Sequence, residues 1–274
     1  MVRSSVSAFV IVALTTHCGG SSEAVVQGEA SSISYNQFLS RVVQEDTGEF
    51  VADGDTLFAD ESELRAFYDS RVATAANETA NVEQGLAIMT SGGKDVKWSS
   101  AQQTNLTYCV STKFGANYNA VVAAMANASS AWASVAKVKF VHVTANDNNC
   151  TANTNVVFDV NPVNVNGSYL ARSFFPNTAR KSRTVKIDNS SFTSSGDPTL
   201  SGILRHELGH TIGFRHEHTR PEAGSKCFED NNWRALTTYD SASVMHYPQC
   251  NGTGDWSLTL TTRDAAGAKA VYPF

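Results

Sequence analysis

Apolar residues follow two different periods along the second half of the chain, and each period predicts its own kind of element. Short runs rich in β-branched and aromatic residues predict strands at 106–110, 138–143, 156–160, 169–174 and 184–187. Apolar residues at helical spacing between Tyr118 and Val135 predict a long amphipathic helix. A last helix is expected over residues 262–271. Strands interleaved with long helices in this way predict an α+β fold.

A further helix is expected to begin after Asp197 and Pro198, because aspartate caps helices well and proline suits a first helical turn. Gly213 is expected to end this helix, since glycine readily adopts the left-handed conformation found after helix ends. The buried side of the helix is predicted to be apolar and to consist of Leu200, Ile203, Leu204 and Leu208.

The first third of the chain has a different pattern and predicts a separate unit. Residues 19–34 are rich in serine, glycine and alanine, which favours a disordered tether. Residues 35–75 are expected to contain some order, because 60–63 resembles a capping box in front of apolar residues at helical spacing. Residues 74–93 are rich in small and polar residues and predict a linker. The α+β domain is therefore expected to span residues 94–274.

The expected helix runs into the sequence HELGHTIGFRH, which places five residues at the spacing HExxHxxGxxH: His206, Glu207, His210, Gly213 and His216. His206 and His210 lie four residues apart, so they share one helix face and can bind one ion together. Glu207 lies beside them, close enough to hold a metal-bound water. A turn at Gly213 would bring His216 back as a third ligand.

Three histidine ligands leave a fourth position for water, which distinguishes a catalytic zinc site from a closed structural one. The pattern therefore predicts one catalytic Zn²⁺, with Glu207 as the general base that takes a proton from the attacking water. The alternative is a cluster of histidines in the core or at the surface. The length of the motif and its helical setting disfavour that alternative.

The sequence Ser-Val-Met-His-Tyr occupies residues 243–247. It resembles the Met-turn of the metzincin metallopeptidases, and most closely the astacin form of that turn. The resemblance implies that Met245 forms an apolar floor under the three histidines, and that Tyr247 is a displaceable fifth zinc ligand that stabilises the oxyanion. A core tyrosine is the alternative for Tyr247. His246 is expected to pack or hydrogen-bond locally.

Two further stretches carry the resemblance. Residues 214–217 are similar to the astacin pattern GFxHE, whose glutamate helps to bury the N-terminus of the mature enzyme; for Glu217 an exposed surface carboxylate is the alternative. The sequences GFRHEHTRPE and LTYCVSTKFG resemble the dual-action HEIGH metallopeptidases, a sister family from bacteria. The resemblance covers residues 94–274 and implies a metzincin-like catalytic domain with a mixed twisted sheet, in a bacterial protein.

These features predict a zinc endopeptidase. By resemblance, the strand at 170–174 is a sheet edge along which an extended peptide or protein substrate pairs antiparallel through backbone hydrogen bonds. A plain edge strand covered by a loop is the alternative. Two other functions stay open. A non-catalytic, zinc-containing extracellular binding module is disfavoured by Glu207, and a small ester or amide hydrolase on the same fold is disfavoured by the edge strand.

The N-terminus predicts export. Arg3 precedes an apolar run from Val6 to Leu14, which is typical of a secretory signal and too short to span a membrane. Cys18 and the Gly-Gly-Ser-Ser after it resemble the start of a bacterial lipoprotein, although Thr15 and His17 fit the preceding lipobox poorly. Residues 1–18 are therefore expected to be a signal peptide. The mature protein is either secreted or an outer-surface or periplasmic lipoprotein anchored through Cys18.

Residues 19–93 are expected to form a tether and propeptide of a zymogen. The stretch from Phe50 to Asp55 is similar to the F-x-G-D motif of astacin propeptides, with two extra residues after Phe50. The resemblance implies that Asp55 binds the zinc and displaces the catalytic water until the propeptide is cut. A simple turn between strands is the alternative. The segment has no cysteine-switch motif, so a matrixin-style latch is not expected.

Length and composition limit the kinds of partner that we expect the protein to bind. With 274 residues the chain has room for one sizeable domain and additions to it. A net charge of −5 without a basic stripe argues against nucleic acid as a partner. The apolar runs are too short to form a transmembrane span. The oligomeric state is left open.

Four cysteines in an exported domain suggest two disulfides, and three pairings of the four cysteines are possible. We favour Cys109–Cys150 and Cys227–Cys250, because each pair closes a loop within one half of the domain.

Overall fold

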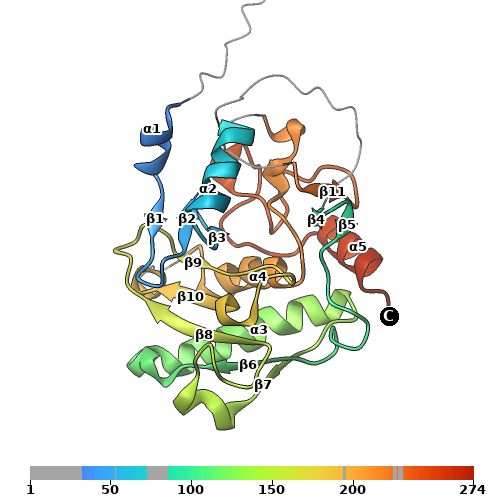
Figure 1. Ribbon diagram of the computed structural model, residues 1–274. Coiled ribbons are helices and arrows are strands. Elements are labelled where there is room, and N and C mark those ends of the chain that lie inside the picture. Colours follow the sequence, from blue (N-terminus) through green and yellow to red (C-terminus); the bar gives the residue numbers. More distant parts are fainter. Residues whose placement is uncertain (1–32, 53, 73–85, 194–195, 225–226, 228–230) are drawn as a thin grey trace, which may run out of the picture.

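A computed structural model describes residues 33–274 of the protein, except residues 53, 73–85, 194–195, 225–226 and 228–230. The predicted signal peptide and Cys18 lie outside the described residues. The two largest hydrophobic cores of the described chain differ greatly in size. We call residues 33–72 the N-terminal unit and residues 86–274 the main unit. In Figure 1 the N-terminal unit, coloured blue to cyan, lies against the main unit on the side of strands β9 and β10.

The N-terminal unit is a three-stranded antiparallel sheet flanked by two short helices. Its elements are α1 (Tyr35–Leu39), β1 (Val43–Gln44), β2 (Phe50–Ala52), β3 (Thr56–Phe58) and α2 (Glu61–Phe67). As the sequence predicted, Asp60 caps α2, and its carboxylate accepts a hydrogen bond from the Glu63 backbone at 3.0 Å. The small core consists of Phe38, Ala52, Phe58, Leu64, Phe67 and Tyr68.

The main unit is built on a five-stranded sheet in the order β7-β6-β8-β10-β9. These strands are β6 (Leu106–Val110), β7 (Phe140–His142), β8 (Phe158–Val163), β9 (Ala171–Arg172) and β10 (Thr184–Asp188). All neighbours pair parallel except β9, which runs antiparallel to β10 and forms one edge. The predicted strands are confirmed, but the edge strand is shorter than the expected 169–174. His142 lies in β7, within the predicted strand range 138–143, and contacts Asp147.

Two long helices pack together beneath this sheet. They are α3 (Tyr118–Val135) and α4 (Leu200–Thr211), and the Trp132 indole of α3 donates a 2.8 Å hydrogen bond to the Arg205 carbonyl of α4. The last helix, α5 (Thr262–Val271), has the predicted bounds. The mixture of a twisted sheet with packed helices is the expected α+β fold. Among the described residues, no helix combines the length and apolar character needed to cross a bilayer.

A second sheet begins inside the segment that the sequence predicted to be a linker. Its strands are β4 (Ala87–Ser91), β5 (Lys94–Asp95) and β11 (Trp233–Ala235), in the order β11-β4-β5. Leu86, Ala87 and Ile88 are completely buried, and Leu86 and Ile88 belong to the large core. The ordered main unit therefore starts by residue 86 rather than at 94. The prediction missed this strand because small and polar neighbours hide its short apolar face.

The structure forms two disulfides in the favoured pairing. Cys109 of β6 is joined to Cys150, and Cys227 is joined to Cys250, with Cα atoms 5.6 Å apart in both pairs. The first disulfide lies inside the sheet half of the main unit, and its sulfur atoms are buried with Val156. The second ties the chain after α4 to the chain just beyond the Ser243–Tyr247 segment.

Candidate active site

Helix α4 starts two residues later than predicted. Thr199, rather than Asp197, is the N-cap, and its hydroxyl accepts a hydrogen bond from the Gly202 backbone at 3.1 Å. The backbone of Thr199 is extended, with φ −73° and ψ 154°, which is the conformation that lets a threonine side chain cap the first turn. From this start the helix carries His206, Glu207 and His210 on its buried side.

Gly213 turns the chain back toward the helix, as predicted. Its φ is +100°, in the left-handed region, and a Cβ atom at this position would lie 2.2 Å from the Val96 carbonyl oxygen. Both the backbone conformation and the available space therefore require glycine. The chain leaves this turn along β4, where Ile88 and Phe214 form an antiparallel bridge. His216 follows and reaches the two helix histidines.

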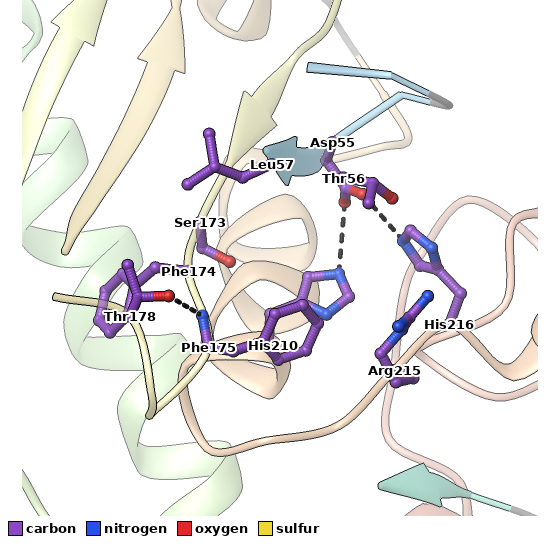
Figure 2. A pocket seen from close by; sticks show the side chains of 10 residues that line it. All are labelled: Asp55, Thr56, Leu57, Ser173, Phe174, Phe175, Thr178, His210, Arg215 and His216. Carbon is purple, nitrogen blue, oxygen red and sulfur yellow. Dashed lines mark hydrogen bonds and ion pairs between the residues drawn. The ribbon is translucent and has the colours of Figure 1, made fainter. Parts of the chain in front are cut away.

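Three histidine side chains and Asp55 meet in one buried cluster, part of which Figure 2 shows. The Asp55 carboxylate lies 3.1 Å from His206 Nε2, 3.4 Å from His210 Nε2 and 2.9 Å from His216 Nε2. One ligand atom from each of the four residues lies within 4.8 Å of the others. The structure thus brings the three predicted ligands and the proposed propeptide ligand to a single point.

The hydrogen bonds behind the histidines fix how their rings are protonated. His206 Nδ1 lies 2.7 Å from the Val244 carbonyl, and His210 Nδ1 lies 2.7 Å from the Phe214 carbonyl. Because a carbonyl oxygen only accepts, both Nδ1 atoms carry the proton and both Nε2 atoms face the cluster with a lone pair. Burial lowers the pKa of His210 to about 4, which favours its neutral, ligating form.

This donor set fits a zinc ion. His210 Nε2 is buried and makes no hydrogen bond to any described residue, and it faces, at 3.4 Å, a carboxylate oxygen that is itself an acceptor. Acceptors that converge in this way repel one another unless a cation or proton lies between them. Imidazole nitrogen and carboxylate oxygen are ligands that zinc prefers in four-coordinate sites. His206, His210, His216 and Asp55 would hold the ion.

Asp55 reaches the cluster from the turn that precedes β3. The approach requires glycine at position 54. The φ of Gly54 is +93°, in the left-handed region, and a Cβ atom there would lie 2.9 Å from the Tyr247 hydroxyl. Burial acts to raise the pKa of Asp55. The interactions with the surrounding imidazole groups, His216 first, outweigh it and hold the pKa of Asp55 well below its usual range. The carboxylate is therefore ionised where it meets the histidines.

Glu207 is buried beside the cluster, and its Oε2 atom makes no hydrogen bond among the described residues. Burial raises the pKa of Glu207 well above its usual range, and the negative charge of Asp55 raises it further. The Ser173 hydroxyl, at the end of the edge strand, donates a 2.9 Å hydrogen bond to the Glu207 backbone carbonyl. A carboxyl group in such surroundings can both accept and return a proton.

The segment Ser243–Tyr247, which we call the proposed Met-turn, packs against helix α4 and is held by Gly209 and Asp264, two residues that the sequence did not reveal. Met245 is completely buried, and a Cβ atom on Gly209 would lie 2.4 Å from its sulfur. Asp264 of α5 is also completely buried; it accepts hydrogen bonds from the Ser243 hydroxyl at 2.5 Å and the Val244 backbone at 2.9 Å. In the sequence, the only feature that distinguishes Asp264 is its position in the first turn of the last helix, where it completes a capping box.

Tyr247 lies against the cluster, with its ring stacked on His206 and its ring centroid 4.6 Å from that of His216. His246 points away and shares a 2.8 Å hydrogen bond with the Tyr239 hydroxyl, which is the local role expected of it. His218, which the sequence did not single out, stacks on His216 and accepts a 3.3 Å hydrogen bond from the Tyr247 backbone.

Glu217 is not the exposed carboxylate that one interpretation of the sequence allowed. It is completely buried and accepts a 3.0 Å hydrogen bond from the Asp240 backbone. The guanidinium of Arg220, which is also buried, lies 3.7 Å from it. Glu217 therefore helps to join the chain after His216 to the loop that leads into the Met-turn.

A pocket opens between the edge of the large sheet and the N-terminal unit (Figure 2). Its lining residues come from both units: Asp55, Thr56, Leu57, Ser173, Phe174, Phe175, Thr178, His210, Arg215 and His216. The residues of β3 thus lie along the chain that continues from the edge strand β9. The N-terminal unit occupies the approach to the histidines from this side.

Comparisons with known proteins place this geometry in a family. A family model described as Matrixin matches residues 97–247, which is more than half of the chain. Zinc metalloproteinase nas-30 of Caenorhabditis elegans is 34% identical over 83 residues, covering 23% of this chain and 11% of that protein. The Bone morphogenetic protein 1 homolog of Strongylocentrotus purpuratus is 36% identical over 81 residues, covering 23% and 13%. The chain thus spans only a small part of the length of these curated relatives.

Among solved structures, myroilysin aligns with a TM-score of 0.49 and 18% sequence identity, covering 69% of this chain and 98% of that chain. The matrixin match is the broader sequence finding, because it runs through β6, α3, α4 and the Met-turn as far as Tyr247. It includes the three histidines, Glu207 and Met245. The expected membership of the metzincins is confirmed: the chain belongs to the matrixin family of metzincin zinc metallopeptidases.

Proposed function

We propose that this protein is a zinc-dependent endopeptidase that is made as an inactive precursor. The observation that carries the proposal is the buried cluster of three histidine Nε2 atoms with Glu207 beside it. A structural zinc site has no use for a carboxylate next to its ligands, whereas a hydrolytic site needs one. The family membership supports the same activity.

In the proposed reaction His206, His210 and His216 hold one Zn²⁺. When bound, zinc supplies a Lewis acid that polarises water and the substrate carbonyl. Glu207 takes a proton from the attacking water as the oxygen bonds to the carbonyl carbon. Glu207 then gives this proton to the departing amine nitrogen as the carbon–nitrogen bond breaks. The Tyr247 hydroxyl donates a hydrogen bond to the carbonyl oxygen as negative charge develops on it.

The proposed substrate is an extended peptide or protein segment. Strand β9 is the edge of the large sheet, so its outer backbone groups would be available to a further strand once the N-terminal unit has left. Residues 173–175 continue from this edge into the pocket beside His210. An extended chain aligned antiparallel to β9 would pass the histidines and place one peptide bond next to Glu207.

Asp55 is the proposed latch of the precursor. Its carboxylate fills the point at which the three histidine Nε2 atoms meet, so it competes with the attacking water for that position. We extend the proposal to a tether and propeptide that begin at residue 19 and end before residue 86, instead of the expected 93, because Leu86 and Ile88 are packed into the core of the main unit. The mature domain would therefore include β4. Removal of the N-terminal unit would open both the metal position and the pocket.

The proposed site of action lies outside the cytoplasm. Residues 1–18 have the pattern of a signal peptide, and the two disulfides favour an oxidising compartment. The two forms of the mature protein, freely secreted or anchored through a lipid on Cys18, have different masses. Mass spectrometry of the mature N-terminus reports signal cleavage, acylation and propeptide removal together.

The decisive experiment is the substitution Glu207→Gln in the full chain, activated by proteolysis alongside the native protein. We expect casein hydrolysis to fall by at least about 100-fold, because proton transfer by a positioned carboxylate supplies rate factors of that order. Zinc content should be unchanged, because Glu207 is not among the ligands. The exposed carboxylate Asp255 provides the control, Asp255→Asn, which should keep full activity. Retained casein hydrolysis in Glu207→Gln would refute the proposed role.

A further inference from the structure

The N-terminal unit has a second point of attachment, which lies away from the histidines. Glu45, in the turn after β1, is buried with only 5% of its surface exposed. Its carboxylate accepts hydrogen bonds from Arg172 Nε at 2.8 Å, Arg172 Nη2 at 2.5 Å and the Tyr169 hydroxyl at 2.5 Å, and it also pairs with Lys186. Two parallel bonds from one guanidinium make this a bidentate pair, the strongest geometry that a carboxylate finds in proteins.

The residues that hold Glu45 belong to the main unit. Arg172 of β9 and Lys186 of β10 are directly opposite each other in the antiparallel register, so both side chains lie on one face of the sheet. Arg172 is completely buried, and its Nη1 donates a 3.3 Å hydrogen bond to the Thr184 carbonyl. The sheet itself therefore contributes one of the hydrogen bonds that hold the guanidinium in place.

The carboxylates that pair with Arg172 come from the N-terminal unit. They are Glu45 and, at 3.2 Å, Glu49. Burial acts to raise the pKa of Glu45, but the hydrogen bonds and charge of Arg172 outweigh it and lower the pKa to about 2. Glu45 is therefore a fully ionised ligand at neutral pH. Removing Glu45 would leave the buried Arg172 charge without one of its two carboxylate partners, and a poorly paired buried charge is destabilising.

The two attachments are linked through one small sheet. Glu45 follows β1, Asp55 precedes β3, and β2 pairs with both strands through Val51 opposite Val43 and Leu57. Glu45 does not touch the histidine cluster, so its hold on the main unit does not depend on a metal ion. The N-terminal unit is thus attached at the metal centre through Asp55 and at the sheet face through Glu45.

We propose that Tyr169, Arg172 and Lys186 form a carboxylate-binding site that keeps the N-terminal unit on the enzyme after the chain between the two units is cut. The inference rests on the proposed function, because it concerns the activation of that same active site. Cleavage and release are then separate steps, and release is the step that starts activity. A freed site on β9 and β10 would accept an acidic side chain, with Glu45 as its first ligand.

The test uses the full chain carrying a recognition sequence for a specific protease between residues 73 and 85. After cutting, gel filtration measures whether the N-terminal fragment stays with the large fragment, both with zinc and with chelator present. We expect the native fragment to stay bound in both conditions. Glu45→Gln should weaken its binding at least about 30-fold, since loss of one partner from a buried charge pair costs affinity of that order. Native peptide hydrolysis should rise only when the fragment is diluted away.

Two further variants complete the test, one within the binding site and one as a control outside it. Lys186→Gln retains the Arg172 pair and should weaken binding less than Glu45→Gln, so it reports on the site if the stronger variant does not fold. Asp69→Asn removes an exposed carboxylate that pairs with Arg65 inside the N-terminal unit, and it should leave retention unchanged. Fragment dissociation constants that are equal for native, Glu45→Gln and Lys186→Gln proteins would overturn the proposal. An inactive large fragment after complete release would instead refute the proposed function. The two outcomes are distinguishable because fragment retention is measured by gel filtration and does not require enzymatic activity.

Discussion

Gly209 and Met245 show how closely single atoms are fitted beneath the histidines. Gly209 occupies a variable position of the HExxH motif, yet the space for its missing side chain is filled by the Met245 sulfur. A Cβ atom there would also lie 3.1 Å from the Trp132 ring. The metal-binding helix, the Met-turn and α3 therefore meet at a residue that has no side chain.

We predict that Gly209→Ala destabilises the protein by up to about 2 kcal/mol. Overpacking a core usually costs about 1–3 kcal/mol, and the higher helix propensity of alanine offsets about 1 kcal/mol of this cost. Thermal unfolding of the full chain gives the measurement. Ser201→Ala, a half-buried position of the same helix, is the matched control and should change the midpoint little. A more stable Gly209→Ala protein would show that Met245 moves aside freely.

The second residue-level prediction concerns Tyr247. Tyr247→Phe removes only the hydroxyl and keeps the ring that stacks on His206. If the hydroxyl stabilises the developing oxyanion, kcat should fall on the order of 100-fold, as happens when one oxyanion donor is lost. Zinc content, measured on the same sample, should stay near that of the native protein. An unchanged kcat would assign Tyr247 to packing alone.

The sequence predicted those site residues whose spacing itself carries the chemistry. His206, His210 and Glu207 lie on one helical turn, and Gly213 marks the point at which the chain comes back. Asp264 could not be found in this way, because it meets Ser243 across 21 residues of sequence and belongs to a different helix. His218 escaped notice for a similar reason, since its contact with Tyr247 spans 29 residues.

Whole elements were predictable where a clear apolar period extended over several turns or strand residues. The bounds of α3 and α5 agree with the pattern, because their apolar faces pack directly into the large core. Strand β4 did not stand out, since only its first residues are buried and its partner β11 is more than 140 residues away. The cap of α4 shifted to Thr199 because an N-cap depends on local backbone angles that composition does not specify.

The contact between α5 and the Met-turn yields a prediction about these two elements. Asp264→Ala would leave the buried Ser243 hydroxyl and the Val244 backbone without their acceptor, and it would also remove the capping box of α5. We expect a loss of stability of about 2–4 kcal/mol, since each buried group left unsatisfied costs about 1–3 kcal/mol. Urea unfolding measures the change.

The exposed Asp255 supplies the control for this prediction. Asp255→Ala removes a carboxylate that accepts a hydrogen bond from the Ser257 backbone only two residues away. Its effect should stay within about 0.5 kcal/mol, as is usual for surface substitutions. If Asp264→Ala were as mild as this control, the Met-turn would be held by packing around Met245 and not by α5.

The molecule as a whole is a main unit with a smaller unit docked over its candidate active site. Among the described residues two ionic attachments join them, one at the histidines through Asp55 and one at the sheet face through Glu45. The sequence predicted the attachment through Asp55 because this residue lies in a recognisable motif. It did not predict the attachment through Glu45, because a lone glutamate in a turn has no distinguishing pattern. The partners of Glu45 also lie more than 120 residues further along the chain.

The Glu45 attachment makes stability depend on pH in a defined range. Its pKa is lowered from the ordinary 4.5 to about 2 in the folded protein, so the ionised form stabilises the fold. This contribution is fully present above pH 4.5 and is lost as the pH falls toward 2. Its full size is about 3 kcal/mol, from the difference between the two pKa values.

Glu45→Gln isolates this contribution, because every other titrating group is shared with the native protein. We expect the difference in unfolding free energy between the two proteins to be constant from pH 7 to pH 5 and to shrink steadily between pH 4.5 and pH 2. Urea titrations at four pH values across this range give the measurement. A difference that stayed the same from pH 7 to pH 2 would mean that Glu45 has an ordinary pKa in the folded protein and that Arg172 does not hold its charge. Such a result would also remove the physical basis of the second attachment.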